Sequence, residues 1–111
     1  TRDMVVALDW PYSAKHRETV TKWVDCFAPN VIQIKSRGSA VIDTALVASG
    51  EIDAYIQLGI KPWDTAAGSL FIPKCGGRIT TPEGSEWNIF NDRILATNGV
   101  LHDRILDMIR E

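Results

Sequence analysis

Short apolar segments of β-strand character alternate along most of this chain with amphipathic segments of helical character. The expected strands cover residues 4–9, 31–35, 53–58, 78–81 and 94–97. The expected helices cover residues 14–28, 39–49, a stretch that begins near residue 64, and residues 100–110. Such alternation is typical of an α/β fold, in which helices cover a central sheet. The 111 residues suffice for one domain of this kind, and no linker divides them.

Local signals mark several helix boundaries. Ser13 is placed to cap the first helix, in which Trp23 and Phe27 belong to an apolar stripe with helical spacing. Gly50 follows the second helix, where a left-handed C-cap favours glycine. Pro73 lies inside the third helical pattern and removes one backbone hydrogen bond, which predicts a kink or early fraying.

Composition excludes several classes of protein. Twelve Lys+Arg against fourteen Asp+Glu give a net charge of −2, and the basic residues are dispersed, so a nucleic-acid partner is not expected. No apolar run approaches the ~20 residues needed to cross a bilayer, and no signal peptide is visible. Cys26 and Cys75 lie outside any C-x-x-C pattern; one disulfide is an alternative, but two buried thiols in a cytoplasmic protein are favoured.

The first of two strand-to-helix turns that could carry chemistry is Ser36-Arg37-Gly38-Ser39-Ala40. A helix N-terminus offers unpaired N–H groups with a partial positive charge, and Gly38 would let a ligand oxygen approach the backbone closely. The turn could therefore hold a phosphate or a sugar hydroxyl. From this stretch alone, the favoured interpretation is that Ser39 simply caps the following helix.

The second turn is KPWDTAAG, residues 61–68. Asp64 at a helix start is usually a capping residue. The Pro62-Trp63 pair, however, stiffens the approach to this carboxylate, and the small residues that follow predict close packing against another backbone. A carboxylate held in this way could bind Mg²⁺, which prefers oxygen ligands. The residues alone leave both interpretations open, with the cap the more frequent.

The remaining polar and aromatic residues give weaker signals. His16 and His102 have no partner at metal-ligand spacing and are expected to be solvated. Trp23 is expected in the core, whereas for the other three tryptophans, in expected loops, partial burial and ligand contact are alternatives. No Ser-His-Asp set and no G-x-S-x-G motif occur.

Four segments together resemble the C-terminal half of the inositol monophosphatase family, Mg²⁺-dependent and lithium-sensitive phosphatases of small phosphate esters. They are RGSAVIDTALVASGEIDAY (37–55), GIKPWDTAAG (59–68), CGGRIT (75–80) and ILATNGVLHDRIL (94–106). The resemblance implies an α/β fold with a mixed, mainly parallel five-stranded sheet packed between helices. It also implies that residues 1–111 form one domain, the substrate side of a two-domain cytoplasmic enzyme that is commonly a homodimer.

The resemblance also implies the site residues. Asp64 matches the family's third catalytic aspartate, a ligand of the second Mg²⁺ that also contacts the substrate hydroxyl beside the ester. Gly38, Ser39 and Ala40 match the turn whose backbone contacts the sugar or inositol ring. Gln57 stands where animal inositol monophosphatases have a glutamate that binds ring hydroxyls. The missing charge argues against inositol specificity, although glutamine can still hydrogen-bond a polyol.

The family's other metal ligands, a glutamate and the carboxylates of a D-P-I/L-D-G-T motif, do not occur in this sequence. These ligands belong to the N-terminal half of the family's enzymes. The activating threonine of that half and its helix N-terminus that binds the phosphate are also missing. Two-metal phosphoryl transfer needs several carboxylates and a phosphate clamp at once. The 111 residues alone are therefore predicted to be inactive, to bind Mg²⁺ weakly, and to form one wall of a site between two domains.

Three hypotheses follow for function. In the first, the chain is the C-terminal half of a phosphoric monoester hydrolase in which a metal-activated water attacks the phosphorus of a phosphorylated polyol or sugar. In the second, it is a non-catalytic binding or interaction module that retains the fold. In the third, which requires an accidental motif match, it is an unrelated α/β ligand-binding domain. The intact Trp63-Asp64 turn favours the enzyme, because a binding module has no need of it.

Overall fold

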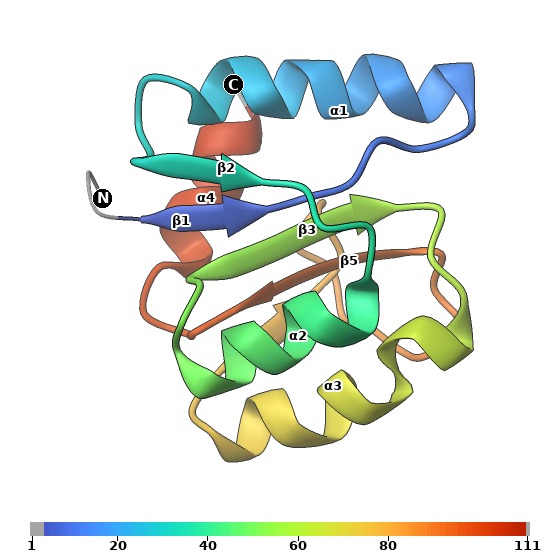
Figure 1. The fold of residues 1–111 in the computed structure, drawn as a ribbon, viewed down its shortest axis with the longest axis vertical. Helices are drawn as coiled ribbons and strands as arrows, with labels where there is room; N and C mark the ends of the chain where they lie inside the picture. Colours follow the sequence, from blue (N-terminus) through green and yellow to red (C-terminus); the bar gives the residue numbers. More distant parts are fainter. Residues whose placement is uncertain (1–3, 111) are drawn as a thin grey trace.

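One mixed sheet forms the middle layer of the computed structural model, which describes residues 4–110 (Figure 1). The strands of this range are β1 (Val5–Ala7), β2 (Gln33–Lys35), β3 (Ala54–Leu58), β4 (Arg78–Thr80) and β5 (Arg93–Thr97), in the spatial order β2-β1-β3-β5-β4. β1 pairs in parallel with β2 and β3, whereas β5 pairs antiparallel with β3 and β4. Four strands therefore run in one direction and β5 opposes them, which confirms the expected mixed, mainly parallel sheet.

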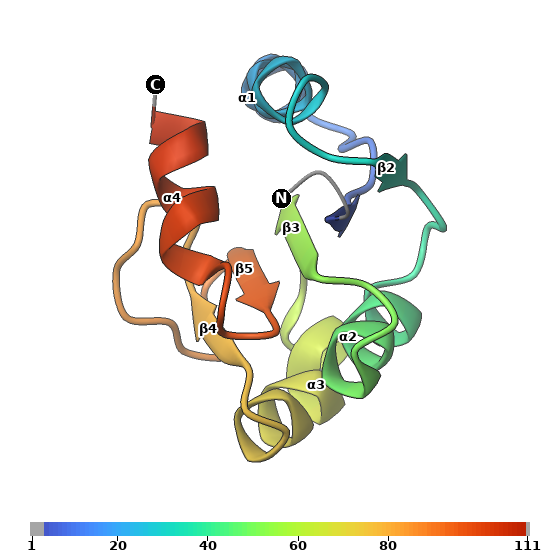
Figure 2. The same ribbon diagram turned by 90° about the vertical axis from the view of Figure 1, so that its left-hand side faces the viewer.

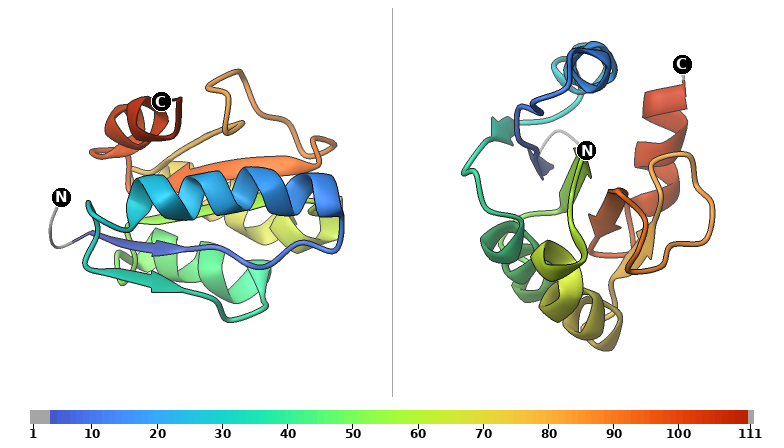
Figure 3. Two further views of the ribbon diagram at one scale, coloured as in Figure 1. Left: turned by 90° about the horizontal axis from the view of Figure 1, so that it is seen from above. Right: turned by 90° about the vertical axis from the view of Figure 1, so that its right-hand side faces the viewer.

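Two helices cover each face of the sheet (Figures 2 and 3). The helices are α1 (Ala14–Phe27), α2 (Ala40–Ser49), α3 (Pro62–Lys74) and α4 (His102–Arg110). α1 and α4 lie on one face, and α2 and α3 on the other. Because successive strand residues point to opposite faces, Val6 and Ile56 join the core under α1 and α4, while Ala7 and Tyr55 join the core under α2 and α3.

The local signals are largely confirmed. The hydroxyl of Ser13 accepts a 3.3 Å hydrogen bond from the backbone N–H of His16, and Gly50 ends α2 with a left-handed φ of +83°. α3 begins at Pro62, two residues earlier than expected, since proline is well tolerated in the first turn. Pro73 lies in the last turn of α3, which continues to Lys74, so proline does not cut the helix short.

The cysteine and tryptophan expectations are only partly confirmed. Cys26 and Cys75 are free thiols, as favoured, but Cys26 is half-buried and Cys75 is exposed. Trp23 is in the core, whereas Trp10 and Trp63 are exposed.

His102 is fully buried, and the expectation that it is solvated is wrong. Its Nε2 lies 2.7 Å from the Thr80 hydroxyl, which itself donates to the Thr81 carbonyl at 2.8 Å. Thr80 therefore accepts from Nε2–H. At the other nitrogen, Nδ1 is 2.9 Å from the Thr97 hydroxyl, whose oxygen already accepts the N–H of Gly99. All these bonds are satisfied by a neutral imidazole protonated at Nε2, because Thr97 can then donate to Nδ1.

Burial lowers the pKa of His102 to about 4, because the charged form loses its hydration, and Arg78 nearby lowers it further. The unfolded chain, whose histidine titrates near 6.5, binds this proton first as the pH falls. The stability that the neutral His102 contributes is therefore complete above about pH 6.5 and is lost towards pH 4, a loss of roughly 3 kcal/mol.

We expect the unfolding free energy to fall across this pH window in the native protein, and the slope to flatten in His102→Gln. The matched variant His16→Gln keeps His102 and should keep the slope. Denaturant titrations at pH 7, 5.5 and 4 measure the effect. An unchanged slope in His102→Gln would show that His102 does not cause it.

Candidate functional site

The ends of β1, β2 and β3 meet the starts of α1, α2 and α3 at one edge of the sheet (Figure 1). The chain leaves β1 towards α1 on one face, whereas it leaves β2 and β3 towards α2 and α3 on the other. Connections that diverge in this way open a crevice outside the carboxyl ends of parallel strands, where α/β proteins bind ligands. The turns singled out in the sequence both lie at this edge.

Asp9, which follows β1, ties the three strand ends together. Its Oδ1 accepts hydrogen bonds from the backbone N–H of Gly38 at 2.8 Å and from the hydroxyl of Ser36 at 3.2 Å. Its own N–H donates to Oε1 of Gln57 at 2.7 Å. The sequence pointed to Gly38 and Gln57 but not to Asp9. The one sequence feature that could have pointed to Asp9 is its position, an acidic residue directly after a buried strand.

The turn of Gly38, Ser39 and Ala40 has a clear structural role. Gly38 has a left-handed φ of +76°, and its N–H is already bonded to Asp9. Ser39 caps α2 by accepting the N–H of Ile42 at 3.2 Å, which confirms the favoured interpretation. The contact of this turn with a sugar or inositol ring stays a prediction, and other backbone groups than the Gly38 N–H would have to make it.

Asp64 lies in the first turn of α3 and is half-buried. Its Oδ2 accepts the backbone N–H of Lys61 at 3.0 Å, so Asp64 is not the N-cap of α3, which is Lys61, but the third helical residue, which bonds back to the N-cap. Within residues 4–110, it forms no ion pair, and its Oδ1 accepts no hydrogen bond. One oxygen thus fixes the carboxylate while the other stays available to a ligand.

Tyr55 of β3 is buried, and burial raises the pKa of its hydroxyl, as do the negative charges of Asp9, Asp43 and Asp64. The link between Asp64 and the Asp9 network runs through Lys61, whose backbone N–H Asp64 accepts. Lys61 lines the same hollow as Asp9, Gly38 and Gln57.

Asp43 is a fully buried carboxylate on α2. Arg37 pairs with its Oδ1 at 2.8 Å, and Oδ2 has no hydrogen-bond partner among the described residues. Burial raises the pKa of Asp43 more than the hydrogen bond from Arg37 lowers it. The ion pair fastens the turn at residues 36–40 to the first turn of α2, next to the crevice.

These carboxylates do not make a complete metal centre. In the part of the chain that the structure describes, no group of three or more His, Cys, Asp or Glu side chains could hold a metal ion. Asp64, with its available Oδ1, fits the role of a single oxygen ligand for a hard cation. Two Mg²⁺ ions would need further ligands from outside these residues.

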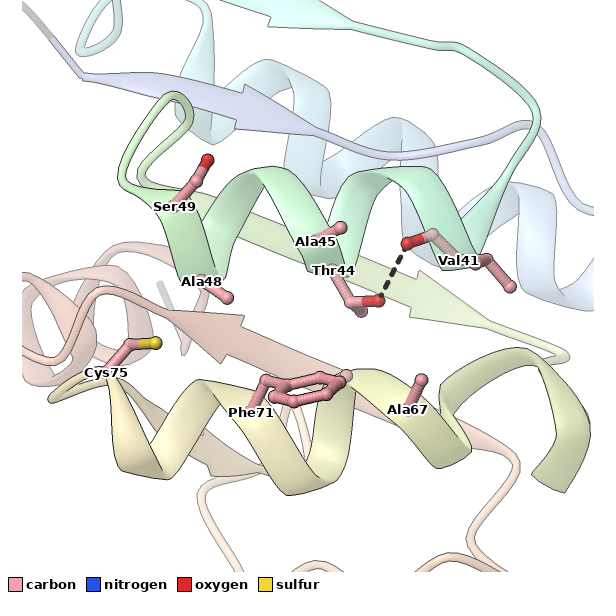
Figure 4. A pocket seen from close by; sticks show the side chains of 9 residues that line it. Val41, Thr44, Ala45, Ala48, Ser49, Ala67, Phe71 and Cys75 are labelled. Carbon is pink, nitrogen blue, oxygen red and sulfur yellow. Dashed lines mark hydrogen bonds between the residues drawn. The ribbon is translucent and has the colours of Figure 1, made fainter.

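The structure has a cleft at the strand ends and a groove between two helices. A cleft of about 560 Å³ includes Gly38 and Gln57 in its lining, together with Asp9, residues 10–13, His16, Arg17 and residues 58, 59 and 61. His16 is half-buried there, although it was expected to be solvated. A second, apolar groove of about 390 Å³ lies between α2 and α3 (Figure 4). At its floor a Cβ on Gly68 would lie 2.5 Å from that of Thr44, which confirms the close packing predicted for this helix.

Comparison with solved structures finds the same fold in an inositol monophosphatase and in a suhB protein. The inositol monophosphatase from Anabaena (Nostoc) sp. PCC 7120 superposes with a TM-score of 0.88 and 30% identity, over 98% of this chain and 44% of that one. The extragenic suppressor protein suhB from Bartonella henselae superposes with a TM-score of 0.90 and 29% identity, over 99% and 42%.

The family model of the inositol monophosphatase family matches residues 8–111, and this chain belongs to that family. It is 31% identical over 90 residues to the fructose-1,6-bisphosphatase/inositol-1-monophosphatase of Thermotoga maritima, covering 81% of this chain and 35% of that protein. It is 40% identical over 81 residues to the inositol-1-monophosphatase of Caulobacter vibrioides, covering 72% and 32%. The chain thus spans less than half the length of the relatives it matches. No helix of residues 4–110 is long and apolar enough to cross a membrane.

Arg37→Met should destabilise the protein by roughly 3–5 kcal/mol near neutral pH, because it leaves the buried carboxylate of Asp43 without a cation. The raised pKa of Asp43 means that its ionised form opposes folding at neutral pH. The loss should therefore shrink as the pH falls and Asp43 is protonated. Denaturant unfolding at pH 7 and pH 4.5 measures both effects.

Arg78→Met is the matched control for this experiment. Arg78 pairs with Asp103 at the surface, where both side chains are exposed, so its loss should cost roughly 1 kcal/mol or less. Equal losses for the two variants would contradict a special role for the Arg37–Asp43 pair.

Proposed function

We propose that this chain is the C-terminal, substrate-side domain of a Mg²⁺-dependent cytoplasmic phosphatase. The enzyme would hydrolyse small phosphate monoesters, inositol monophosphate or a related sugar or polyol phosphate. The observation that carries this proposal is Asp64, which is oriented by the backbone of Lys61 and has an oxygen available. Lys61 in turn lines the same cleft as Asp9, Gly38 and Gln57. Membership of the inositol monophosphatase family supports it.

Each residue has a distinct proposed role. Asp64 would act as one ligand of the second Mg²⁺ and would orient the substrate hydroxyl next to the ester. The bound metals would supply the activated water and the stabilisation of the leaving alkoxide. The backbone of residues 38–40 and the amide of Gln57 would bind the carbon skeleton. Because the bond from Lys61 N–H holds one carboxylate oxygen, the ligand position is set before substrate binds.

A second domain is needed to complete this site. The outer side of α2 and α3 carries large apolar side chains that are exposed: Val41, Ile42, Trp63, Leu70 and Phe71. An apolar surface of this kind, beside the groove shown in Figure 4, is typical of a face that another polypeptide surface covers. We propose that the N-terminal domain of the same enzyme covers it and brings the missing carboxylates to Asp64. Assembly into a homodimer is a further expectation from the family.

A second candidate function is a non-catalytic interaction module. One relative, 32% identical over 108 residues that cover 96% of this chain and 40% of that protein, is the Nus factor SuhB of Vibrio cholerae. The name of this relative is that of a Nus factor, and this observation favours the second candidate. A D-P-I/L-D-G-T motif in the parent reading frame would favour the enzyme.

The two candidates differ in phosphate release. We expect no release above background from the 111 residues alone, and release from the complete protein or from the chain mixed with its N-terminal half. In the complete protein, Asp64→Asn should lower kcat/KM by about 100-fold or more, because a charge that stabilises the transition state is lost. Thermal unfolding should change little.

Asp25→Asn is the matched control, since Asp25 is exposed near the far end of α1. This variant should retain full turnover. Phosphate release by the 111 residues alone, or normal turnover in Asp64→Asn, would overturn the proposed function.

A further inference from the structure

Asp9 contacts both of the elements to which the proposed function assigns the carbon skeleton of the substrate. Its carboxylate Oδ1 accepts the backbone N–H of Gly38 at 2.8 Å and the hydroxyl of Ser36 at 3.2 Å. Its own backbone N–H donates to Oε1 of Gln57 at 2.7 Å. One residue that follows β1 therefore sets the place of a turn that follows β2 relative to a side chain of β3.

The turn at residues 36–40 gains a restraint from this contact. Gly38 has a left-handed φ of +76°, and a Cβ on it would have no neighbour within 4 Å, so glycine serves the backbone conformation here and not a close approach. Glycine has the most conformational freedom to lose, so it is costly to fix. Within residues 4–110, the hydrogen bonds that leave this turn go to α2 and to Asp9. Asp9 thus aligns the start of α2 with the ends of β1 and β3.

The carboxylate of Asp64 is fixed separately. It is oriented by the backbone N–H of Lys61, within the first turn of α3. In the part of the chain that the structure describes, the hydrogen bonds of Asp9 reach neither of these two residues. A change at Asp9 should therefore alter how the carbon skeleton fits and leave the Asp64 carboxylate in place.

We infer that Asp9 is a positioning residue that determines how well the enzyme distinguishes a phosphorylated polyol from a phosphate ester without hydroxyl groups. It acts through the backbone of residues 38–40 and the amide of Gln57, and it does so by the place of its Oδ1 and not by its charge. Because this oxygen occupies the N–H of Gly38, the backbone groups of the turn that remain for a substrate point in the direction that Asp9 sets. The inference rests on the proposed function, which assigns the skeleton to these residues.

The test compares, in the complete protein, a polyol monophosphate with phenyl phosphate, a monoester that lacks the hydroxyl-bearing skeleton. The measured quantity is the kcat/KM of the polyol ester divided by that of phenyl phosphate. Asp9→Ala should lower this ratio by about tenfold, mainly through a higher KM for the polyol ester, because a misplaced binding group weakens the ground state and the transition state alike. Asp9→Asn retains an oxygen acceptor at the same place and should keep the ratio within about twofold of the native value.

Asp9→Glu is the complementary variant, because it keeps the charge and moves the carboxylate by one methylene group. It should lower the ratio as Asp9→Ala does, and it tests the inference even where Asp9→Ala does not fold. Asp53→Ala is the matched control. Asp53 accepts the backbone N–H of Val5 at 2.8 Å and an N–H of the Asn98 side chain at 3.1 Å, but it does so at the opposite end of β3. Its loss should lower the free energy of unfolding and leave the ratio unchanged.

The outcomes separate a positioning role from a structural one. A ratio that Asp9→Ala and Asp9→Glu leave unchanged overturns the inference, and so does an equal loss of kcat/KM for both substrates. If Asp9→Asn is as poor as Asp9→Ala, the inference is also wrong, because the charge would then be what matters. All three results leave the proposed function standing. Failure of the native complete protein to hydrolyse either substrate overturns the proposed function, and this inference with it.

Discussion

The side chain of Asp9 is the contact on which the rest of the site depends. The regular backbone hydrogen bonds between parallel strands stop near the strand ends, where the connections diverge. Side-chain contacts therefore help to define the crevice that opens there. Asp9 does this by bonding the turn after β2 through Gly38 and Ser36, and β3 through Gln57. It thereby fixes Gly38 and Gln57, two of the residues that the family resemblance assigns to substrate. This contact therefore adds side-chain bonds at the carboxyl ends of three strands that the sheet already joins.

Acidic residues lie near this contact, although a carboxylate that is buried loses favourable hydration. Asp43 is fully buried and pairs with Arg37, and burial together with the negative charges of Asp9, Asp43 and Asp64 raises the pKa of the Tyr55 hydroxyl. Charges of one sign at one edge are stabilised here by helix geometry, because α2 and α3 both begin at this edge and direct their positive ends towards it. The helix N-termini that border the crevice thus lower the energetic cost of placing several carboxylates at one edge.

Signals within a few residues allowed much of the fold to be predicted, and contacts between distant residues account for most of what was missed. The cap at Ser13 and the stop at Gly50 depend on local geometry, and both could be recognised from the sequence. The network of Asp9 joins residues 29 and 48 positions apart, which periodicity does not reveal. His102 was assigned to the surface because its partners, Thr80 and Thr97, come from two strands of the sheet.

The strand edge has two sides of different character. Towards α2 and α3, the carboxylate of Asp64 has an oxygen available, and exposed apolar side chains lie on the same two helices, which favours a cation shared with a second domain. Towards α1, the strand ends open into a cleft whose lining includes Asp9, Gly38 and Gln57. Because Asp9 bonds both Gly38 and Gln57, one side chain shapes the wall of this cleft and also holds the turn from which α2 begins.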